Sequence, residues 1–504
     1  MPTKTITINR FDLGISKERR DLANGYFRYL ENVAVGDEFR SIKQVPNVTS
    51  AEGTKSIKAI IEAGNEVYGL GQDADPDTTI YKCTSTEGAT PAWGTITNGT
   101  ATGYNPNSGA KPFFAYYGST IYYASGGYIG TYVGTTNTPN VVAAANIQGG
   151  VVQKSMIYGW IGQSVYEFDP SDNSLTNMIT IPSDQTIVDL VPMGDIMAII
   201  CTSNARSTAS KCYLWDRVTT TTFLDIIDIG YGDVAGADIL DGVLIAVIGF
   251  ANRQGFRIKR FTGNLFTNEI TYFALKNDVA DYEFAYVASL VKSYTNYIYF
   301  LVRIFRPSSS YANYDELVLF RYGRTDETKQ NALSVYKTIK TGTSTLGTTN
   351  DFIVAEAFDV SADIGKPDKF IIASIIDGST YDEIATSLTS GDAVYSAQAG
   401  LIETAIYTGD ASHINKKFLG FTTSCEPLPS GASIVVKGRT DANTSYTTLA
   451  TLSVANTITK ETMTIESTGA NLPDFKEIQF RFELLGGAEM TGFKFKYEEM
   501  NNLI

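Results

Sequence analysis

The sequence predicts an all-β protein, with a β-propeller of six or seven blades followed by a C-terminal β-sandwich of jelly-roll-like form. The first observation is a strand-and-turn pattern between about residues 55 and 390, where short apolar runs alternate with clusters of Gly, Asn, Asp, Ser and Thr. The second is the recurrence of these runs as one repeated unit. The third is a change, beyond residue 400, to segments in which apolar and polar residues alternate.

The repeated unit contains an apolar stretch, a turn with Gly, Asp or Asn, a second apolar stretch, a polar loop and a third strand that carries Tyr or Phe. Copies of this unit occur at residues 59–82, 113–132, 156–169, 190–216, 237–261, 288–322 and 352–376, the last two being less regular. They start roughly 35 to 65 residues apart, which overlaps the length of one propeller blade. Because a single blade cannot bury both of its faces, a closed ring of such units is the expected architecture.

The alternating segments near the C-terminus lie at residues 417–423, 432–439, 446–450, 462–466, 477–484 and 491–497. Strands with one apolar and one polar face pack as a sandwich. We therefore expect three parts: an N-terminal segment at residues 1–50, a propeller at residues 51–396 and a sandwich at residues 397–504. The N-terminal segment is expected to pack elsewhere in an assembly, with a short turn or helix at residues 17–29.

Glycines in the turns of the repeated unit are expected to adopt positive φ, since a residue without a Cβ does so at little cost. Gly64, Gly118 and Gly242 occupy such positions. Trp215 and Asp216 form the Trp-Asp dipeptide of one class of propeller repeat, but no Gly-His pair precedes them. We interpret this dipeptide as an ordinary strand end.

The formal charge of −14 argues against nucleic-acid binding, which requires clustered Lys and Arg. The densest basic cluster runs only from Lys17 to Arg20. The N-terminus lacks the apolar region of a signal peptide, and no apolar run approaches the roughly 18 residues that cross a membrane. We therefore expect no specific nucleic-acid binding and no membrane span.

Cysteine and histidine provide no recognisable metal site or catalytic nucleophile. The four cysteines, Cys83, Cys201, Cys212 and Cys425, show no Cys-x-x-Cys spacing. Cys201 and Cys212 are spaced to face each other across a hairpin, but so sparse a set in so long a chain favours unpaired thiols. His413 is the only imidazole and lies in a polar segment before a strand, so we interpret it as a surface or capping residue.

The remaining chemical patterns are weak. The segment from Asp73 to Asp77 begins like a calcium loop, but Thr78 and Thr84 stand where that loop needs glycine and glutamate, which favours an acidic hairpin loop. Many tyrosines suit either sugar stacking or the more common cross-strand pairing. They include Tyr116, Tyr117, Tyr122, Tyr123 and Tyr128. No motif selects a carboxylate pair for glycoside hydrolysis. The sequence therefore predicts no catalytic, cofactor-binding or metal-binding residue, and a protein that is not an enzyme.

Motifs at both ends of the chain carry a family resemblance. The front contains Phe11-Asp-Leu-Gly-Ile15, arginines a few residues later, and Leu30-Glu-Asn32. The back contains characteristic stretches at residues 416–421, 428–441, 478–484 and 492–498. In this order, over about 40 residues at the front and 100 at the back, they resemble virion structural proteins of tailed bacteriophages, in which such a start precedes a propeller. The middle of the chain matches in architecture only.

The resemblance implies a structural component of a phage particle, in the tail or the head-to-tail connection, that works by subunit assembly and not by catalysis. It implies partners among tail, neck or adaptor subunits, a homo-oligomeric ring, no cofactor, and a place in the virion after synthesis in the host cytoplasm. The first alternative is a receptor- or glycan-binding tail protein for host attachment, with a host surface glycan as partner. A polysaccharide depolymerase is a more distant alternative, and a cellular propeller adaptor lacks support from the terminal motifs.

Overall fold

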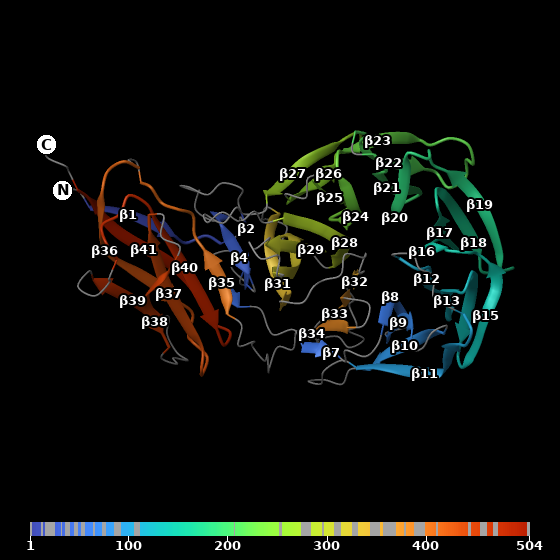
Figure 1. Ribbon diagram of the computed structural model, residues 1–504, viewed down its shortest axis with the longest axis horizontal. Coiled ribbons are helices and arrows are strands. Elements are labelled where there is room, and N and C mark those ends of the chain that lie inside the picture. The colour runs from blue at the N-terminus through green and yellow to red at the C-terminus, as the bar shows by residue number, and fades with distance from the viewer. Residues whose placement is uncertain are drawn as a thin grey trace.

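Every secondary-structure element described in the computed structural model is a β-strand. The strands form a ring of four-stranded sheets and a two-sheet sandwich, which lie side by side (Figure 1). Over the described ranges, we find no helix of the length and apolarity needed to cross a membrane. The structure describes residues 3–11, 14–15, 26–31, 33–35, 41–44, 49–51, 56–63, 66–72, 77–84, 92–104, 111–205, 207–250, 255–273, 284–294, 297–306, 314–324, 331–342, 353–355, 369–376, 380–387, 399–409, 412–441, 445–453, 461–466 and 472–500.

The first four blades of the ring follow one another along the chain, each with its strands paired antiparallel in sequence order. Blade 1 consists of β8 (Ser56–Ala63), β9 (Glu66–Gln72), β10 (Thr78–Thr84) and β11 (Ala92–Ala101). Blade 2 consists of β12 (Phe114–Tyr117), β13 (Thr120–Ser125), β14 (Tyr128–Val133) and β15 (Thr136–Ala143). Blade 3 consists of β16 (Gln148–Gln153), β17 (Met156–Ile161), β18 (Ser164–Asp169) and β19 (Ser174–Thr180). Blade 4 consists of β20 (Gln185–Met193), β21 (Ile196–Ser203), β22 (Ser210–Trp215) and β23 (Asp225–Gly230).

Three further blades complete the ring. Blade 5 consists of β24 (Asp233–Leu240), β25 (Val243–Gly249), β26 (Gly255–Phe261) and β27 (Phe266–Phe273). Blade 6 consists of β28 (Phe284–Tyr294), β29 (Tyr297–Arg306), β30 (Tyr314–Gly323) and β31 (Ala332–Gly342). Blade 7 consists of β32 (Ile353–Ala355), β33 (Lys369–Ile376), β34 (Thr380–Ser387) and, from the other end of the chain, β7 (Thr49–Ala51). The predicted propeller is confirmed, and each predicted repeat falls in one blade.

The innermost strands close the ring. Contacts run from β8 to β12, β16, β20, β24, β28 and β32, and β32 returns to β8. The outermost strand of blade 7 is β7, whose Thr49 and Ala51 pair with Ala385 and Glu383 of β34. Blade 7 therefore joins the beginning and the end of the propeller segment, as ring closure requires.

Aromatic side chains on the third strand of a blade form much of the propeller core. Such fully or nearly fully buried residues occur in each of blades 1 to 6: Tyr81, Tyr132, Phe168, Tyr213, Trp215, Phe256, Phe320 and Tyr322. Phe256 shows the packing, with ring centroids 4.9 Å from Tyr272, 5.1 Å from Phe300 and 5.4 Å from Phe320. Burying each such ring stabilises the fold by roughly 1.5–3 kcal/mol. The abundance of Tyr and Phe therefore reflects the blades.

The sandwich consists of two sheets. One has the order β39 (Glu461–Glu466), β36 (Lys416–Cys425), β41 (Glu489–Glu499), β6 (Ile42–Gln44), β5 (Val33–Val35), with β1 (Thr3–Ile8) also paired with β41. The other has the order β38 (Thr447–Leu452), β37 (Ser433–Thr440), β40 (Ile478–Leu485), β35 (Gly400–Glu403), β4 (Tyr29–Glu31). Phe493 packs between the sheets, with its ring 4.8 Å from both Phe480 and Phe482. The predicted sandwich is confirmed, and its predicted strands correspond to β36–β41.

The N-terminal segment departs from the expectation that residues 1–50 pack elsewhere in an assembly. Its strand β1 pairs with β41, β4 pairs with β35, and β6 pairs with the start of β41. A short parallel pair, β2 (Gly14–Ile15) and β3 (Tyr26–Phe27), accompanies them. The physical reason is that the edges of β41 and β35 present unpaired backbone groups, which these strands satisfy. Of the expected turn or helix at 17–29, residues 17–25 lie outside the described residues, and Tyr26–Phe27 and Tyr29 are in strands.

A shared core joins the sandwich to blade 6. Leu30 and Val33 of the N-terminal segment belong to the same buried apolar cluster as Phe320. Arg321, only 7% exposed, donates hydrogen bonds to Ser334 Oγ (3.1 Å) and to the carbonyl of Val33 (3.4 Å). Its guanidinium also lies 4.6 Å from the centre of the Tyr297 ring. The two units therefore contact each other through buried groups and not only through a linker.

Two of the predicted turn glycines allow a stability test. Gly118 and Gly242 have φ of +55° and +75°, as predicted, while Gly64 lies outside the described residues. A Cβ at either position meets nothing within 4 Å, so substitution acts through the backbone alone. We expect Gly118→Val and Gly242→Val each to lower the free energy of unfolding by at least about 1–2 kcal/mol, measured by urea denaturation.

Gly94→Val is the matched control. Gly94 lies in β11 without positive φ, and a Cβ there meets only the Lys82 carbonyl at 3.9 Å. If both turn variants are as stable as the wild type, the assignment of these glycines to turns with positive φ is wrong, whatever the stability of the control.

Candidate functional site in the propeller channel

A recess of about 350 Å³ opens where the innermost strands of blades 1 to 5 converge. Its walls come from β8, β12, β16, β20 and β24 and from Lys111, which precedes β12. Apolar groups such as Phe114 and Val151 share this lining with Glu62, Asp189 and Asp238. A concave site with a few convergent polar groups is the default place to look for binding in a protein of this kind.

Two glycines of blade 3 form part of the lining of the recess. Gly149 and Gly150 lie at a β-bulge in β16 and have φ of +92° and +112°. A Cβ on Gly150 would collide with the Phe114 backbone, and one on Gly149 would collide with the Trp160 ring. Glycine is therefore required at both positions by conformation and by space.

An ion pair crosses the recess from blade 2 to blade 4. Lys111 Nζ lies 2.6 Å from Asp189 Oδ1, which also accepts a hydrogen bond from the Leu190 backbone N–H at 3.0 Å. The Asp189 side chain is 9% exposed, whereas that of Lys111 is 36% exposed. The lysine therefore compensates a buried carboxylate, which would be costly to hold without a partner.

A second carboxylate in the lining is fixed by blade 6. Asp238 Oδ2 accepts hydrogen bonds from the backbone N–H of Ser293, at 2.7 Å, and from its hydroxyl, at 2.9 Å. Asp238 Oδ1 accepts from the Ile239 N–H at 2.8 Å. With Glu62, the recess holds three carboxylates and one ammonium, so its field favours cationic or hydrogen-bond-donating groups.

Sequence reasoning did not identify these residues as a site. The signal in the sequence is that Asp189 and Asp238 interrupt apolar first strands, between Val188 and Leu190 and between Ala237 and Ile239. Lys111 carries no such signal, because it reaches Asp189 from another blade.

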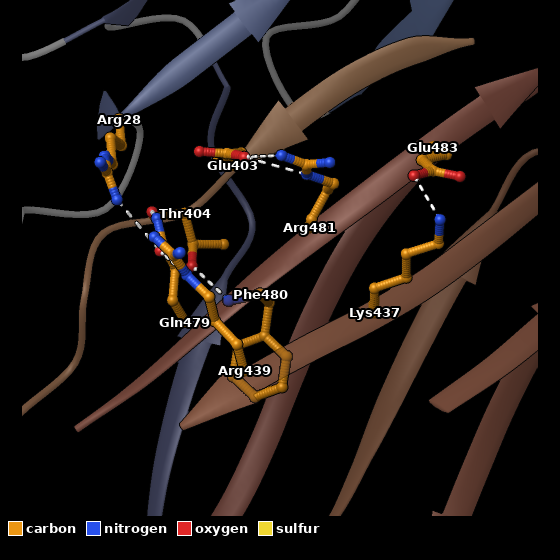
Figure 2. A network of polar contacts seen from close by, with 9 residues as sticks. All are labelled: Arg28, Glu403, Thr404, Lys437, Arg439, Gln479, Phe480, Arg481 and Glu483. Carbon is orange, nitrogen blue, oxygen red and sulfur yellow. Dashed lines mark hydrogen bonds and ion pairs between the residues drawn. The ribbon is translucent and has the colours of Figure 1, made fainter. Parts of the chain in front are cut away.

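A second polar site lies on the sandwich sheet that contains β37, β40 and β35 (Figure 2). At its centre, Gln479 Oε1 accepts hydrogen bonds from Arg28 Nη1 at 3.2 Å and Arg439 Nε at 2.9 Å. The Gln479 amide donates to the carbonyl of Thr404 at 2.8 Å. Arg481 donates through Nε and Nη2 to Glu403 Oε1 beside it.

A third pair and a tyrosine complete this polar site. Lys437 Nζ lies 2.6 Å from Glu483 Oε1. The guanidinium carbons of Arg439 and Arg481 lie 4.8 and 4.4 Å from the centre of the Tyr446 ring. Burial opposes the charge of Arg481, but the carboxylate of Glu403 prevails and raises the pKa of Arg481. Arg481 is therefore charged at neutral pH.

Most of the residues that the sequence singled out lie apart from both sites, but Tyr116 of β12 lines the recess. His413 is exposed in a turn, in line with its interpretation as a surface residue. Trp215 ends β22 fully buried, and the Asp216 carboxylate accepts hydrogen bonds from the Val218 and Thr219 N–H groups, which confirms an ordinary strand end. Of the segment 73–77, only Asp77 is described, and its carboxylate accepts from the Gly103 N–H at 2.8 Å.

Where their side chains are described, the cysteines are buried. Cys212 stands opposite Ile200, not Cys201, in the β21–β22 register, Cys201 and Cys212 are free and buried, and Cys425 is also buried. The Cys83 side chain lies outside the described residues. Burial raises the pKa of Cys212 to about 12 and also raises the pKa of Cys201, so both side chains remain protonated thiols at neutral pH. Within the described part of the chain, no group of three or more His, Cys, Asp or Glu is placed to hold a metal ion.

The tyrosines of blade 2 mostly serve the core. Tyr122 and Tyr123 are 6% and 0% exposed, and Tyr123 stands opposite Phe114 across the β12–β13 pair. Only Tyr128, at 38%, is counted among the exposed large apolar residues. Cross-strand pairing therefore explains Tyr122 and Tyr123 better than sugar stacking does.

Comparison with known proteins shows similarity in fold only. No protein-family model matches the sequence, and no curated protein is similar to it. The WD40 domain of coronin from Toxoplasma gondii is similar over 73% of this chain and 89% of that chain, with 10% identity and a TM-score of 0.41. The WD40 β-propeller domain of Doa1 is similar over 68% of this chain and 96% of that chain, with 9% identity and a TM-score of 0.38. At such values the likeness carries no argument about function.

The ion pair of the recess gives a second prediction. Lys111→Met leaves the buried Asp189 carboxylate without its cation, and we expect the free energy of unfolding to fall by about 1–3 kcal/mol, less than for a wholly buried pair because Lys111 is partly exposed. The double variant Lys111→Met/Asp189→Asn should be more stable than Lys111→Met alone, since the buried charge is gone. Urea denaturation of the complete double-mutant cycle measures both effects.

Lys154→Met provides the control for this cycle. Lys154 pairs with Asp195, and these side chains are 63% and 87% exposed, so loss of that pair should have almost no effect. Equal effects of the Lys111 and Lys154 substitutions would show that the recess pair is no more important than a surface pair.

Proposed function

We propose that this chain is a structural component of a bacteriophage particle, in the tail or the head-to-tail connection, and that it acts by subunit assembly. The observation that carries the proposal is the joint folding of the two terminal regions that resemble phage virion proteins. Residues 29–31 at the front pair with residues 401–403, which pair in turn with residues 481–483 in one of the back stretches. The separate stretches of resemblance thus belong to one domain, as expected if they derive from one module.

The architecture suits an assembly role. A propeller is a rigid body whose blade-connecting loops and exposed outer strands offer broad surfaces to neighbouring subunits. Lys111 pairs with Asp189, which connects blades 2 and 4. Ser293 donates hydrogen bonds to Asp238, which connects blades 5 and 6. We propose that such bodies form a closed homo-oligomeric ring through heterologous contacts.

Host attachment through a glycan is the second candidate function. It needs exposed aromatic rings, and the described structure offers few in blade 2, where Tyr122 and Tyr123 are buried. On the sandwich, the ring of Tyr446 is faced by two guanidinium groups. These contacts favour the assembly role over sugar stacking at either place.

The proposal is tested on particles. Phage particles purified from a culture that produces this chain should contain it at a fixed copy number, and electron microscopy should show its density in the tail or neck as a ring. The chain's absence from purified particles, or a gene neighbourhood without capsid and portal genes, would contradict the proposal. Saturable, sugar-competed binding of the full chain on a glycan array would instead favour host attachment.

A further inference from the structure

Large apolar side chains are exposed together at the outer edge of blade 4. Val218, Leu224, Ile226 and Tyr231 are between 51% and 79% exposed, and they make up half of the large apolar residues that are exposed in the described structure. Ile226 lies in β23, the outermost strand of the blade, and the other three lie in the loops on either side of it. Single exposed apolar residues are ordinary, whereas a group of them marks a surface that another molecule covers.

The two faces of β23 have different surroundings. Ile227 and Ile229 are buried in the apolar cluster that blade 4 shares with blade 5. Ile226 alternates with them and therefore lies on the other face, where it remains half exposed. The Ile226 N–H donates a hydrogen bond to its neighbour Asp225 at 2.8 Å, so a charged side chain occupies the edge of the strand. A partner therefore meets this surface through side chains and not by adding a strand.

The charges around these apolar residues are negative. Every charged residue from position 218 to position 233 is an aspartate: Asp225, Asp228 and Asp233. All three are exposed, and Lys211, which is half-buried in β22, stands opposite Asp228. We call the four apolar residues and the three aspartates the blade 4 patch. A surface that fits this patch presents cations on apolar stems.

The sandwich of the same chain has such a surface. In β41, Phe493, Phe495 and Tyr497 are buried, whereas Lys494 and Lys496 alternate with them and are exposed. Lys417 of β36, also exposed, stands opposite Glu498, the one acidic residue on this face of β41. The neighbouring strand β1 adds the exposed threonines Thr5 and Thr7, opposite Lys496 and Lys494. We call Lys417, Lys494, Lys496 and these two threonines the lysine face.

We propose that the blade 4 patch of one subunit docks on the lysine face of a second copy of this chain. The methylene stems of the lysines and the methyl groups of the threonines cover Leu224 and Ile226, while the ammonium groups reach the aspartates. Two blade 4 patches do not fit each other, because their aspartates would repel.

The two surfaces lie on different units of the protein. β36 and β41 are in the sandwich at one end of the molecule, whereas β23 is on the rim of the propeller (Figure 1). A contact between unlike surfaces is heterologous, and its repetition by rotation closes a ring. The inference rests on the proposed function, for which it supplies the contact between subunits.

Charge reversal of the full chain tests the contact. Sedimentation velocity at 50 and 300 mM NaCl, over a series of protein concentrations, should show self-association of the wild type that weakens at the higher salt concentration. Asp225→Lys/Asp228→Lys and Lys494→Glu/Lys496→Glu should each weaken association at least tenfold, because like charges then face each other. An equimolar mixture of the two variants should associate again, because every contact in it joins opposite charges.

The apolar part of the patch has its own variant and control. Ile226→Gln should also weaken association at least tenfold. Leu265→Gln makes a similar change at a residue of blade 5 that is 46% exposed, and it should associate as the wild type does. Asp195→Lys, in a turn of blade 4 outside the patch, is the control for the charge reversals. Urea denaturation confirms that each variant is folded.

Three results would overturn the inference. They are a folded wild type that stays monomeric at every concentration, a mixture of the two reversed variants that does not associate, and equal losses in the control variants. Association in the isolated chain is independent of whether phage particles contain it. Failure of the contact is therefore distinguishable from failure of the proposed function.

Discussion

Pairing between the two ends of the chain holds both units of the protein together. β7 pairs with β34 to complete blade 7, and β1 and β4 pair with β41 and β35 to complete the sandwich. Each of these pairings satisfies backbone groups that would otherwise remain at a sheet edge. The propeller is thus an insertion within the sandwich. It closes through its own first and last strands, whereas the sandwich needs residues from before and after the propeller. The apolar contacts around Arg321 then fix one unit against the other.

Ring closure also explains the polar centre of the propeller. Innermost strands that meet around an axis bring side chains of several blades together, so a charge placed there can be bonded by groups of other blades. Lys111 pairs with Asp189 in the recess that Gly149 and Gly150 also line, and Asp238 is held by Ser293 of blade 6. These polar contacts, together with the aromatic packing of the third strands, hold the blades in fixed positions relative to one another.

Much of the fold follows from local sequence pattern, whereas its closure does not. The blades were predictable because each one contains apolar strands in the same order. The pattern of buried residues therefore recurs along the chain once per blade. The segment that forms β7, Thr49–Ala51, is too short and too polar to be predicted as a strand, and its partner β34 lies more than 300 residues away in the sequence. The strands of the N-terminal segment were missed for the same reason, since their faces are defined by β41 and β35. For the recess, the sequence shows Asp189 and Asp238 as single charged residues within apolar strands. Their bonding partners could not be predicted, because residues of other blades approach them only when the ring closes.

The interleaving of the termini constrains how the protein is made. Thr3 pairs with Glu498, so β1 leaves the ribosome long before the strand with which it pairs. At synthesis rates of about 5–20 residues per second that delay is about 25–100 s. For this time β1 exposes its backbone groups, and its charged and polar residues, Thr3, Lys4, Thr5 and Thr7, protect it from pairing with other chains. A nascent chain cut short before β41 would contain a closed propeller and an open sandwich, and the missing strand would be one that another copy can supply.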